Sequence, residues 1–188
     1  MARKVVIDAC CMLNLLATGR EVDIVRSLGL LLLETPQVSR EPVCLTTAPD
    51  EDGVRRKEPT SAASLRAAGL LETYALSTEA LIDAFVACSA RIKDTDASCI
   101  ALAGVLQLPL VTDDRKERKI ARDIFPAIAL LSTLDLIHEA ASSLQWSADE
   151  LVSIASSLRW RGNFAPPRRD PRGEWYLALL EQAGISTS

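Results

Sequence analysis

Short apolar runs alternate with longer helix-like segments between residues 4 and 131, and this alternation is the feature that most limits the possible folds. The runs of strand length are 4–8, 30–34, 70–76, 108–112 and 127–131. The segments with helical patterns are 12–17, 21–28, 38–46, 78–92, 96–106 and 114–125. Strands that alternate with helices form parallel sheets through right-handed crossovers. We therefore predict an α/β fold with a small parallel sheet flanked by helices.

The chain after Leu134 has helical patterns only, at 134–144, 148–160 and 174–183. We therefore expect one domain over residues 1–145 and a helical C-terminal extension, 146–188, packed on it. Within the 78–92 helix, the pattern predicts one buried face that comprises Leu81, Ile82, Phe85, Val86, Ser89 and Ile92. The segment from Pro49 to Ser61 has an acidic run, a glycine and a basic run, which predict a surface loop.

Composition excludes several classes of protein. No eighteen consecutive residues are apolar, which predicts no membrane span, and the apolar run near the N-terminus is too short for a secretory signal. We therefore expect a cytoplasmic protein. The five cysteines form no CxxC pair, so neither a disulfide framework nor a zinc site is indicated. With His138 as the only histidine, mechanisms and metal sites that need two histidines are excluded.

The formal net charge of −4 argues against nucleic-acid binding by bulk electrostatics, yet the cations are clustered. One cluster comprises Arg115, Lys116, Arg118, Lys119 and Arg122; a second comprises Arg159, Arg161, Arg168, Arg169 and Arg172. A basic cluster on an acidic protein indicates either a local phosphate-binding face or a solvated helix surface.

Acids follow two of the predicted strands. Asp8 comes directly after one strand, and Asp113 and Asp114 come after another, so all three should meet at the carboxyl edge of the sheet. Asp96 begins a predicted helix, where Thr95 would be the cap, and Glu41 lies on the short helix before Pro42. Any one of these acids alone is explained by capping or solvation. As a set of oxygen ligands, they suit Mg²⁺ or Mn²⁺.

Two runs resemble the PIN-domain nucleases. The run VIDACCMLNLLATG resembles the family's opening strand, acid and leucine-rich helix. The run DASCIALAGVLQLPLVTDDRKERKIA resembles its middle, with acid, small-residue helix, strand, threonine and second acid in order. With the helical end, the resemblance covers most of the chain and is strongest to prokaryotic toxin–antitoxin PIN proteins.

The resemblance implies roles for individual residues. The catalytic metal-binding acids would be Asp8, Glu41, Asp96 and Asp114, with Asp113 as an additional metal ligand. Thr112 would position Asp114 or the scissile phosphate. Substrate contacts would come from Thr112, Asn14, Arg115, Lys116 and Lys119. The match is loosest at Glu41, and the segment after it has no counterpart in the family.

The implied activity is hydrolysis of RNA phosphodiester bonds with Mg²⁺ or Mn²⁺, by the toxin of a toxin–antitoxin pair. The implied partners are RNA, a protein antitoxin and a second copy of the chain, with no membrane. One alternative is a PIN-like module that has lost catalysis and acts by binding. Another is a receiver domain, which needs a lysine after its last strand; Ser132 and Thr133 stand there instead.

Overall fold

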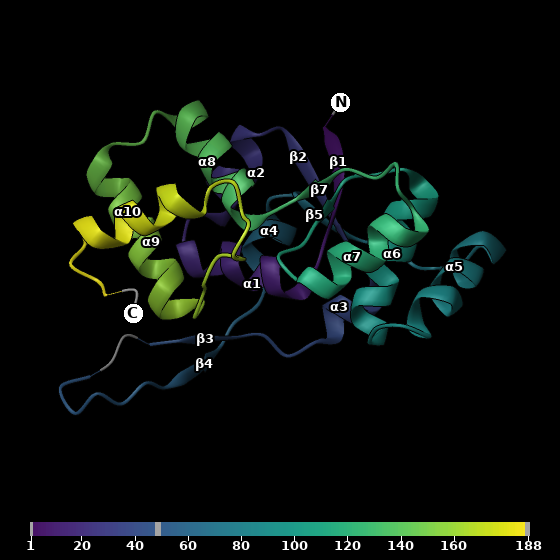
Figure 1. Cartoon of the computed structure of the whole chain (residues 1–188), viewed down its shortest axis with the longest axis horizontal. Coiled ribbons are helices and arrows are strands. Elements are labelled where there is room, and N and C mark those ends of the chain that lie inside the picture. Colours follow the sequence, from purple (N-terminus) through teal and green to yellow (C-terminus); the bar gives the residue numbers. More distant parts are fainter. Residues whose placement is uncertain (1, 48–49, 187–188) are drawn as a thin grey trace.

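The computed structural model describes residues 2–47 and 50–186, and its centre is a five-stranded parallel sheet (Figure 1). The strands of this sheet are β1 (Arg3–Ile7), β2 (Leu30–Glu34), β5 (Leu71–Thr73), β6 (Leu110–Val111) and β7 (Leu130–Leu131). They are ordered β5-β2-β1-β6-β7. The predicted α/β fold with a small parallel sheet between helices is confirmed.

The chain changes direction across the sheet at β1. After β1 it moves outward through β2 to β5, and it then returns to place β6 on the other side of β1. Val6 and Ile7 of β1 pair with Leu110 and Val111 of β6, so these strands end side by side. Such a switch in strand order opens a crevice at the carboxyl ends of the two central strands. Asp8 lies at this switch point.

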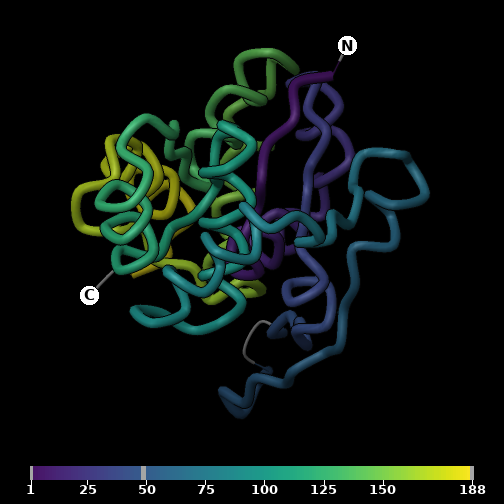
Figure 2. Tube along the Cα trace, turned by 90° about the vertical axis from the view of Figure 1, so that its right-hand side faces the viewer, coloured from purple at the N-terminus to yellow at the C-terminus, as the bar shows by residue number. Residues whose placement is uncertain are grey.

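Helices cover both faces of the sheet, as Figures 1 and 2 show. On one face, β1 and β2 pack with α1 (Ala9–Thr18), α2 (Glu21–Ser27), α4 (Ala63–Ala67), α8 (Thr133–Leu144), α9 (Ala148–Arg161) and α10 (Gly173–Gln182). On the other face lie α3 (Pro36–Arg40), α5 (Glu79–Ser89), α6 (Asp94–Leu106) and α7 (Arg115–Ile124). The alternation of side chains along β1 separates the two cores: Val5 and Ile7 face one, and Val6 faces the other.

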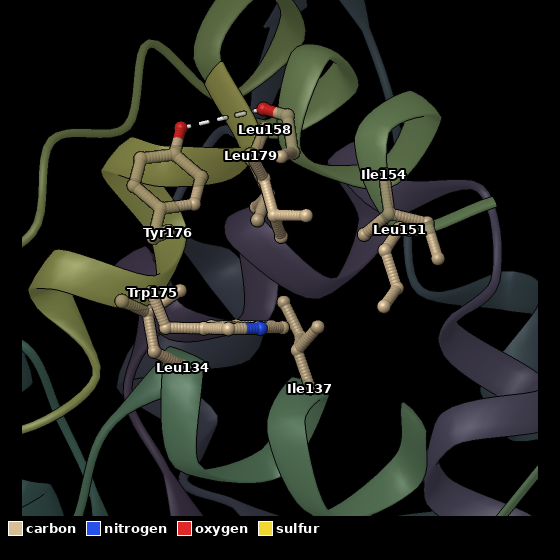
Figure 3. A pocket seen from close by; sticks show the side chains of 9 residues that line it. Leu134, Ile137, Leu151, Ile154, Leu158, Trp175, Tyr176 and Leu179 are labelled. Carbon is tan, nitrogen blue, oxygen red and sulfur yellow. Dashed lines mark hydrogen bonds between the residues drawn. The ribbon is translucent and has the colours of Figure 1, made fainter. Parts of the chain in front are cut away.

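The three C-terminal helices share the core of the first face. Figure 3 shows Trp175 and Tyr176 of α10 meeting aliphatic side chains of α8 and α9. The Tyr176 hydroxyl donates a hydrogen bond to the Ala155 carbonyl over 3.3 Å, and Trp175 packs edge-on against His138 at 5.0 Å between ring centroids. These side chains leave no volume that a water molecule could enter. The contact surface is therefore packing, not a binding site.

Two predictions between β2 and β5 are wrong. The predicted helix at 38–46 is α3 instead, and it ends before Pro42; Glu41 is its C-cap, with extended backbone. The predicted loop contains a strand, because β4 (Lys57–Pro59) pairs antiparallel with β3 (Cys44–Thr46) in a hairpin. In both views the hairpin extends away from the sheet (Figures 1 and 2). Pro49, where the predicted loop begins, lies outside the described residues.

The predicted buried face of the 78–92 helix is confirmed only in part. Leu81 and Ile92 are buried, whereas Ile82 and Val86 are 48% and 59% exposed. α5 packs mainly against α6 and lies at the end of the molecule (Figure 1), so half of its apolar residues have no neighbour to cover them. Among the described residues, no helix is both long and apolar enough to cross a lipid bilayer.

Candidate functional site

Asp8 occupies the switch point between β1 and β6. It is 3% exposed, and its backbone nitrogen donates a hydrogen bond to the Val111 carbonyl over 3.2 Å, which continues the β1–β6 pairing by one residue. Its Oδ1 accepts a hydrogen bond from the Cys11 backbone nitrogen over 2.5 Å, so Asp8 is the N-cap of α1. The strand delivers the carboxylate, and the start of the helix fixes its direction.

The segment after β6 places its two acids differently. Asp114 is exposed and is the N-cap of α7, accepting a hydrogen bond from the Glu117 backbone nitrogen over 2.7 Å. The buried Thr112 hydroxyl oxygen accepts a hydrogen bond from the Asp114 backbone nitrogen over 3.1 Å. Thr112 therefore holds the backbone of Asp114 in place.

Both carboxylate oxygens of Asp113 accept hydrogen bonds from other residues of the protein. Its Oδ1 accepts a hydrogen bond from the Thr133 backbone nitrogen at 3.0 Å. Its Oδ2 accepts three more, from the Thr133 hydroxyl at 2.6 Å, the Asn14 amide at 3.1 Å and the Cys11 thiol at 3.3 Å. Asn14 is 6% exposed, so its amide links α1 to the start of α8 instead of facing solvent. In this structure both residues connect elements of the fold.

Glu117 is a site residue that the sequence patterns did not single out. Its side chain is completely buried, and its Oε2 accepts a hydrogen bond from the Thr112 hydroxyl over 2.7 Å. The charges of Asp8 and Asp96 both act on it. The signal that could have found it is its position: one acid among five cations, three residues after the helix N-cap, where a glutamate turns back toward the preceding strand.

Asp96 and Glu41 approach the same place from α6 and α3. Asp96 lies in the first turn of α6, which begins at Asp94 with Lys93 as N-cap. Thr95 therefore lies inside the helix and is not the predicted cap. The Lys93 ammonium lies between the two acids, 3.4 Å from Asp96 Oδ1 and 3.5 Å from Glu41 Oε1. A cation of the chain itself thus bridges these two carboxylates.

Electrostatics couple these acids to one another. Burial raises the pKa of Asp8 to about 6, and the charge of Asp113 adds to this, although hydrogen bonds from Cys11 and Thr112 oppose it. Burial raises the pKa of Asp96, with further contributions from Asp114 and Glu41 against the opposing effect of Lys93. Burial, followed by the charge of Asp8, raises the pKa of Glu117 well above its usual value. Burial therefore disfavours the ionised forms of Asp8, Asp96 and Glu117, and the neighbouring carboxylates add to this effect.

The carboxylate oxygens are the type of ligand that a hard divalent cation such as Mg²⁺ prefers. Oε2 of Glu41 and Oε1 of Glu117 are buried and have no hydrogen-bond partner among the described residues. Unpaired buried oxygens are costly, and a divalent cation would stabilise them. Within residues 2–47 and 50–186, however, no three His, Cys, Asp or Glu side chains are grouped as ligands of one ion. From these positions, one shared ion requires side-chain rotation.

Basic residues of α7 lie next to this site. Arg115, Lys116, Lys119 and Arg122 are exposed. Arg118, which belongs to the same run of cations, turns inward and donates hydrogen bonds to the carbonyls of Thr112, Leu130 and Leu131. Arg118 therefore joins the ends of β6 and β7, and the other four cations form a solvent-facing surface.

In comparisons with known proteins, no family model, no curated protein and no solved structure matches this chain.

Proposed function

We propose that this protein is a PIN-like ribonuclease that hydrolyses RNA phosphodiester bonds with Mg²⁺ or Mn²⁺. The observation that carries the proposal is the convergence of Asp8, Asp96 and Glu117 at the switch point, each with a raised pKa and with Asp114 and Glu41 beside them. Without a bound cation, the ionised forms of these neighbouring acids are electrostatically unfavourable. Perturbed carboxylates in a crevice at the carboxyl edge of a parallel sheet are typical of function.

In this proposal the cation would be held by Asp8, Glu41, Asp96 and Asp114. Glu117 would add negative charge beside Asp8 and Asp96. A cation held by these residues would supply Lewis-acid chemistry, lowering the pKa of water and stabilising negative charge on a phosphoryl group. The Thr112 hydroxyl orients both acids, because it donates a hydrogen bond to Glu117 and accepts one from the Asp114 backbone nitrogen. The exposed cations of α7 bind the phosphate backbone without reading sequence.

The test is cleavage of labelled RNA by the purified chain in Mg²⁺ or Mn²⁺, with EDTA as the block. The matched variants are Asp96→Asn and Asp149→Asn; Asp149 is an exposed acid in the first turn of α9. Loss of only a helix-dipole contact costs about 0.3–1 kcal/mol of stability and leaves cleavage intact. We expect Asp96→Asn to abolish cleavage and Asp149→Asn to leave it unchanged. Cleavage that persists in EDTA, or products with 2′,3′-cyclic ends, would contradict the proposal.

A second candidate function is a PIN-like module that binds partners without catalysis. Lys93 favours it, since an internal cation already bridges Glu41 and Asp96. The two functions differ in the response to Mn²⁺. A nuclease should melt at higher temperature with Mn²⁺, because binding to the folded state stabilises it by mass action. An inactive module with a permanent lysine bridge should show no shift.

The family resemblance extends the proposal to a cytoplasmic homodimer whose acidic site is blocked by a protein antitoxin. Co-expression with the product of the adjacent reading frame tests this extension. The expected result is a stable complex in which RNA cleavage is suppressed. A chain that remains active and unbound beside that product would remove the toxin–antitoxin part and leave the nuclease assignment in place.

A further inference from the structure

A cleft of about 500 Å³ adjoins the carboxylate site. One wall is α3, the other is the base of the β3–β4 hairpin with the start of α4, and Ala9 and Met12 of α1 lie at its floor. Glu41 of the site and Ala9, the neighbour of Asp8, both line it, so the cleft lies next to the site. Its volume lies within the range of about 300–1,000 Å³ that is usual for ligand sites.

We propose that this cleft binds one nucleotide of the RNA, adjacent to the phosphodiester that is cut. The inference rests on the proposed ribonuclease function and adds to it a place for the substrate. The base of the β3–β4 hairpin lines one part of the cleft, through Cys44, Pro59 and Thr60, so the hairpin would contact the bound nucleotide.

The lining combines the surfaces that a nucleotide needs. Pro42 and Val43 present apolar surface on which the face of a base can lie. Thr60 and Ser61 at the base of the hairpin carry hydroxyls that can bond to base edges or to the ribose. The lining thus combines apolar side chains with polar and charged ones, and in ligand sites such polar groups fix the orientation of the ligand.

Arg66 is held rigidly at one side of the cleft. Its guanidinium forms an ion pair with Glu34, whose side chain is 3% exposed, and hydrogen bonds to Thr73 Oγ1 at 3.2 Å and Ser39 Oγ at 3.1 Å. Glu34 also accepts a hydrogen bond from Thr73 over 2.9 Å. Because Glu34 balances the charge of Arg66, this pair shapes the wall and adds little net charge.

Arg40 supplies the unbalanced positive charge. It is exposed on α3, lines the cleft and forms no ion pair with the residues that the structure describes. The carboxylate of Glu41, its neighbour, already faces Lys93 at 3.5 Å. An anionic phosphate in the cleft would therefore meet Arg40, the lining cation that no carboxylate of the described residues neutralises. The arrangement fits the phosphate that follows the bound nucleotide.

The cleft can be tested with the four ribonucleoside 5′-monophosphates, titrated by calorimetry and mapped by amide chemical shifts. Two substitutions change the cleft: Arg40→Glu reverses its charge, and Ala63→Phe fills it from the exposed first residue of α4. Each has a matched control outside the cleft. Arg26→Glu changes an exposed arginine on α2, and Ala67→Phe changes an exposed alanine on the same helix as Ala63.

We expect wild type to bind at least one monophosphate, with shifts along α3 and at the base of the hairpin. Arg40→Glu and Ala63→Phe should weaken binding at least tenfold, which is about 1.4 kcal/mol. Both should raise the KM for RNA, and both controls should behave as wild type. Thermal melts within a few degrees of wild type would show that the variants are folded.

The outcomes separate this inference from the nuclease proposal. Nucleotide binding that the cleft variants lose, in a chain that cuts no RNA, supports the cleft and removes the nuclease. RNA cleavage with an unchanged KM in Arg40→Glu and Ala63→Phe keeps the nuclease and overturns the cleft. Failure of wild type to bind any monophosphate, while RNA is still cut, also overturns it and leaves the cleft to an occupant of another kind, such as a peptide.

Discussion

Thr112 and Glu117 are joined by a buried hydrogen bond of 2.7 Å, in which the threonine hydroxyl donates to Oε2. The opposite oxygen, Oε1, is buried and has no partner among the described residues. Glu117 is thus half-satisfied: one oxygen is fixed by the end of β6, and the other lies in the acidic site.

Replacing Glu117 with glutamine should stabilise the metal-free protein and lower its activity. Glutamine keeps an oxygen that can accept from Thr112, and it removes a carboxyl group whose ionisation is opposed by burial and by the charges of Asp8 and Asp96. We expect a higher midpoint in urea and at least a tenfold loss of Mn²⁺-dependent cleavage. Glu139→Gln, at an exposed position on α8, is the control. A variant that is both less stable and fully active would contradict the role given to Glu117.

The raised pKa of Asp8 predicts how stability depends on pH. In the folded chain this pKa is about 6, against an ordinary value of 3.8. Between these values the folded chain keeps a proton that the unfolded chain has released, so the free energy of unfolding should fall as pH rises through this window. Asp96 and Glu117 act in the same direction.

Asp8→Asn tests that dependence. Asparagine is as good an N-cap as aspartate, so α1 keeps its start. We expect the variant to lose less stability than wild type between about pH 4 and pH 6. Urea unfolding at several pH values in chelator measures this. Parallel pH profiles for the two proteins would show that Asp8 is not the group responsible.

Lys93→Met separates the internal cation from the metal. Methionine keeps much of the side-chain length and removes the charge that lies 3.4 Å from Asp96 and 3.5 Å from Glu41. Because half of the lysine is exposed, the metal-free protein should lose only about 0.2–1 kcal/mol. Mn²⁺ should then raise the melting temperature more than in wild type. Lys57→Met, on the exposed β4 strand, serves for comparison, and an equal Mn²⁺ shift in all three proteins would rule out competition.

Adjacent cations of α7 should respond in opposite ways. Arg118→Met removes donors from three backbone carbonyls at the ends of β6 and β7, so it should destabilise the fold by about 1–3 kcal/mol. Lys119→Glu, at an exposed position, should leave stability nearly unchanged, weaken RNA binding and reduce its salt dependence. Denaturation and RNA binding at several salt concentrations measure both effects. Equal RNA affinities for wild type and Lys119→Glu would leave α7 as a solvated surface.

The sheet was predictable because its strands are locally distinct. The run before Asp8 is apolar and β-branched, and the run 30–34 is leucine-rich; both fill a buried parallel sheet, and both form strands close to the predicted bounds. The hairpin was not predictable in the same way. Its second strand, Lys57–Pro59, is wholly exposed and charged, so it has no alternation of apolar and polar residues. Pairing with β3, and not local pattern, makes it a strand.

The site was predictable where an acid follows a strand, and less so where it lies on a helix. Asp8 is near the carboxyl edge because β1 ends there. Glu117 was missed since the cations around it dominate the pattern, and burial of one face of α7 cannot be read from charge alone. The side chains of Asn14 and Arg118 point inward because they bond to Thr133 and Leu131. These partners lie more than ten residues away, so local sequence does not reveal them.

The order of strands also governs when the site can exist during synthesis. The hydrogen bond between Cys11 and Asp113 spans 102 positions, and the one between Asn14 and Thr133 spans 119. Contacts this distant form only after a large loop has closed, which costs entropy and slows folding. A growing chain that has exposed Asp8 therefore has no site until β6 and the start of α8 have followed. If the chain is the nuclease proposed above, the nascent polypeptide could not cut RNA before these later segments have left the ribosome.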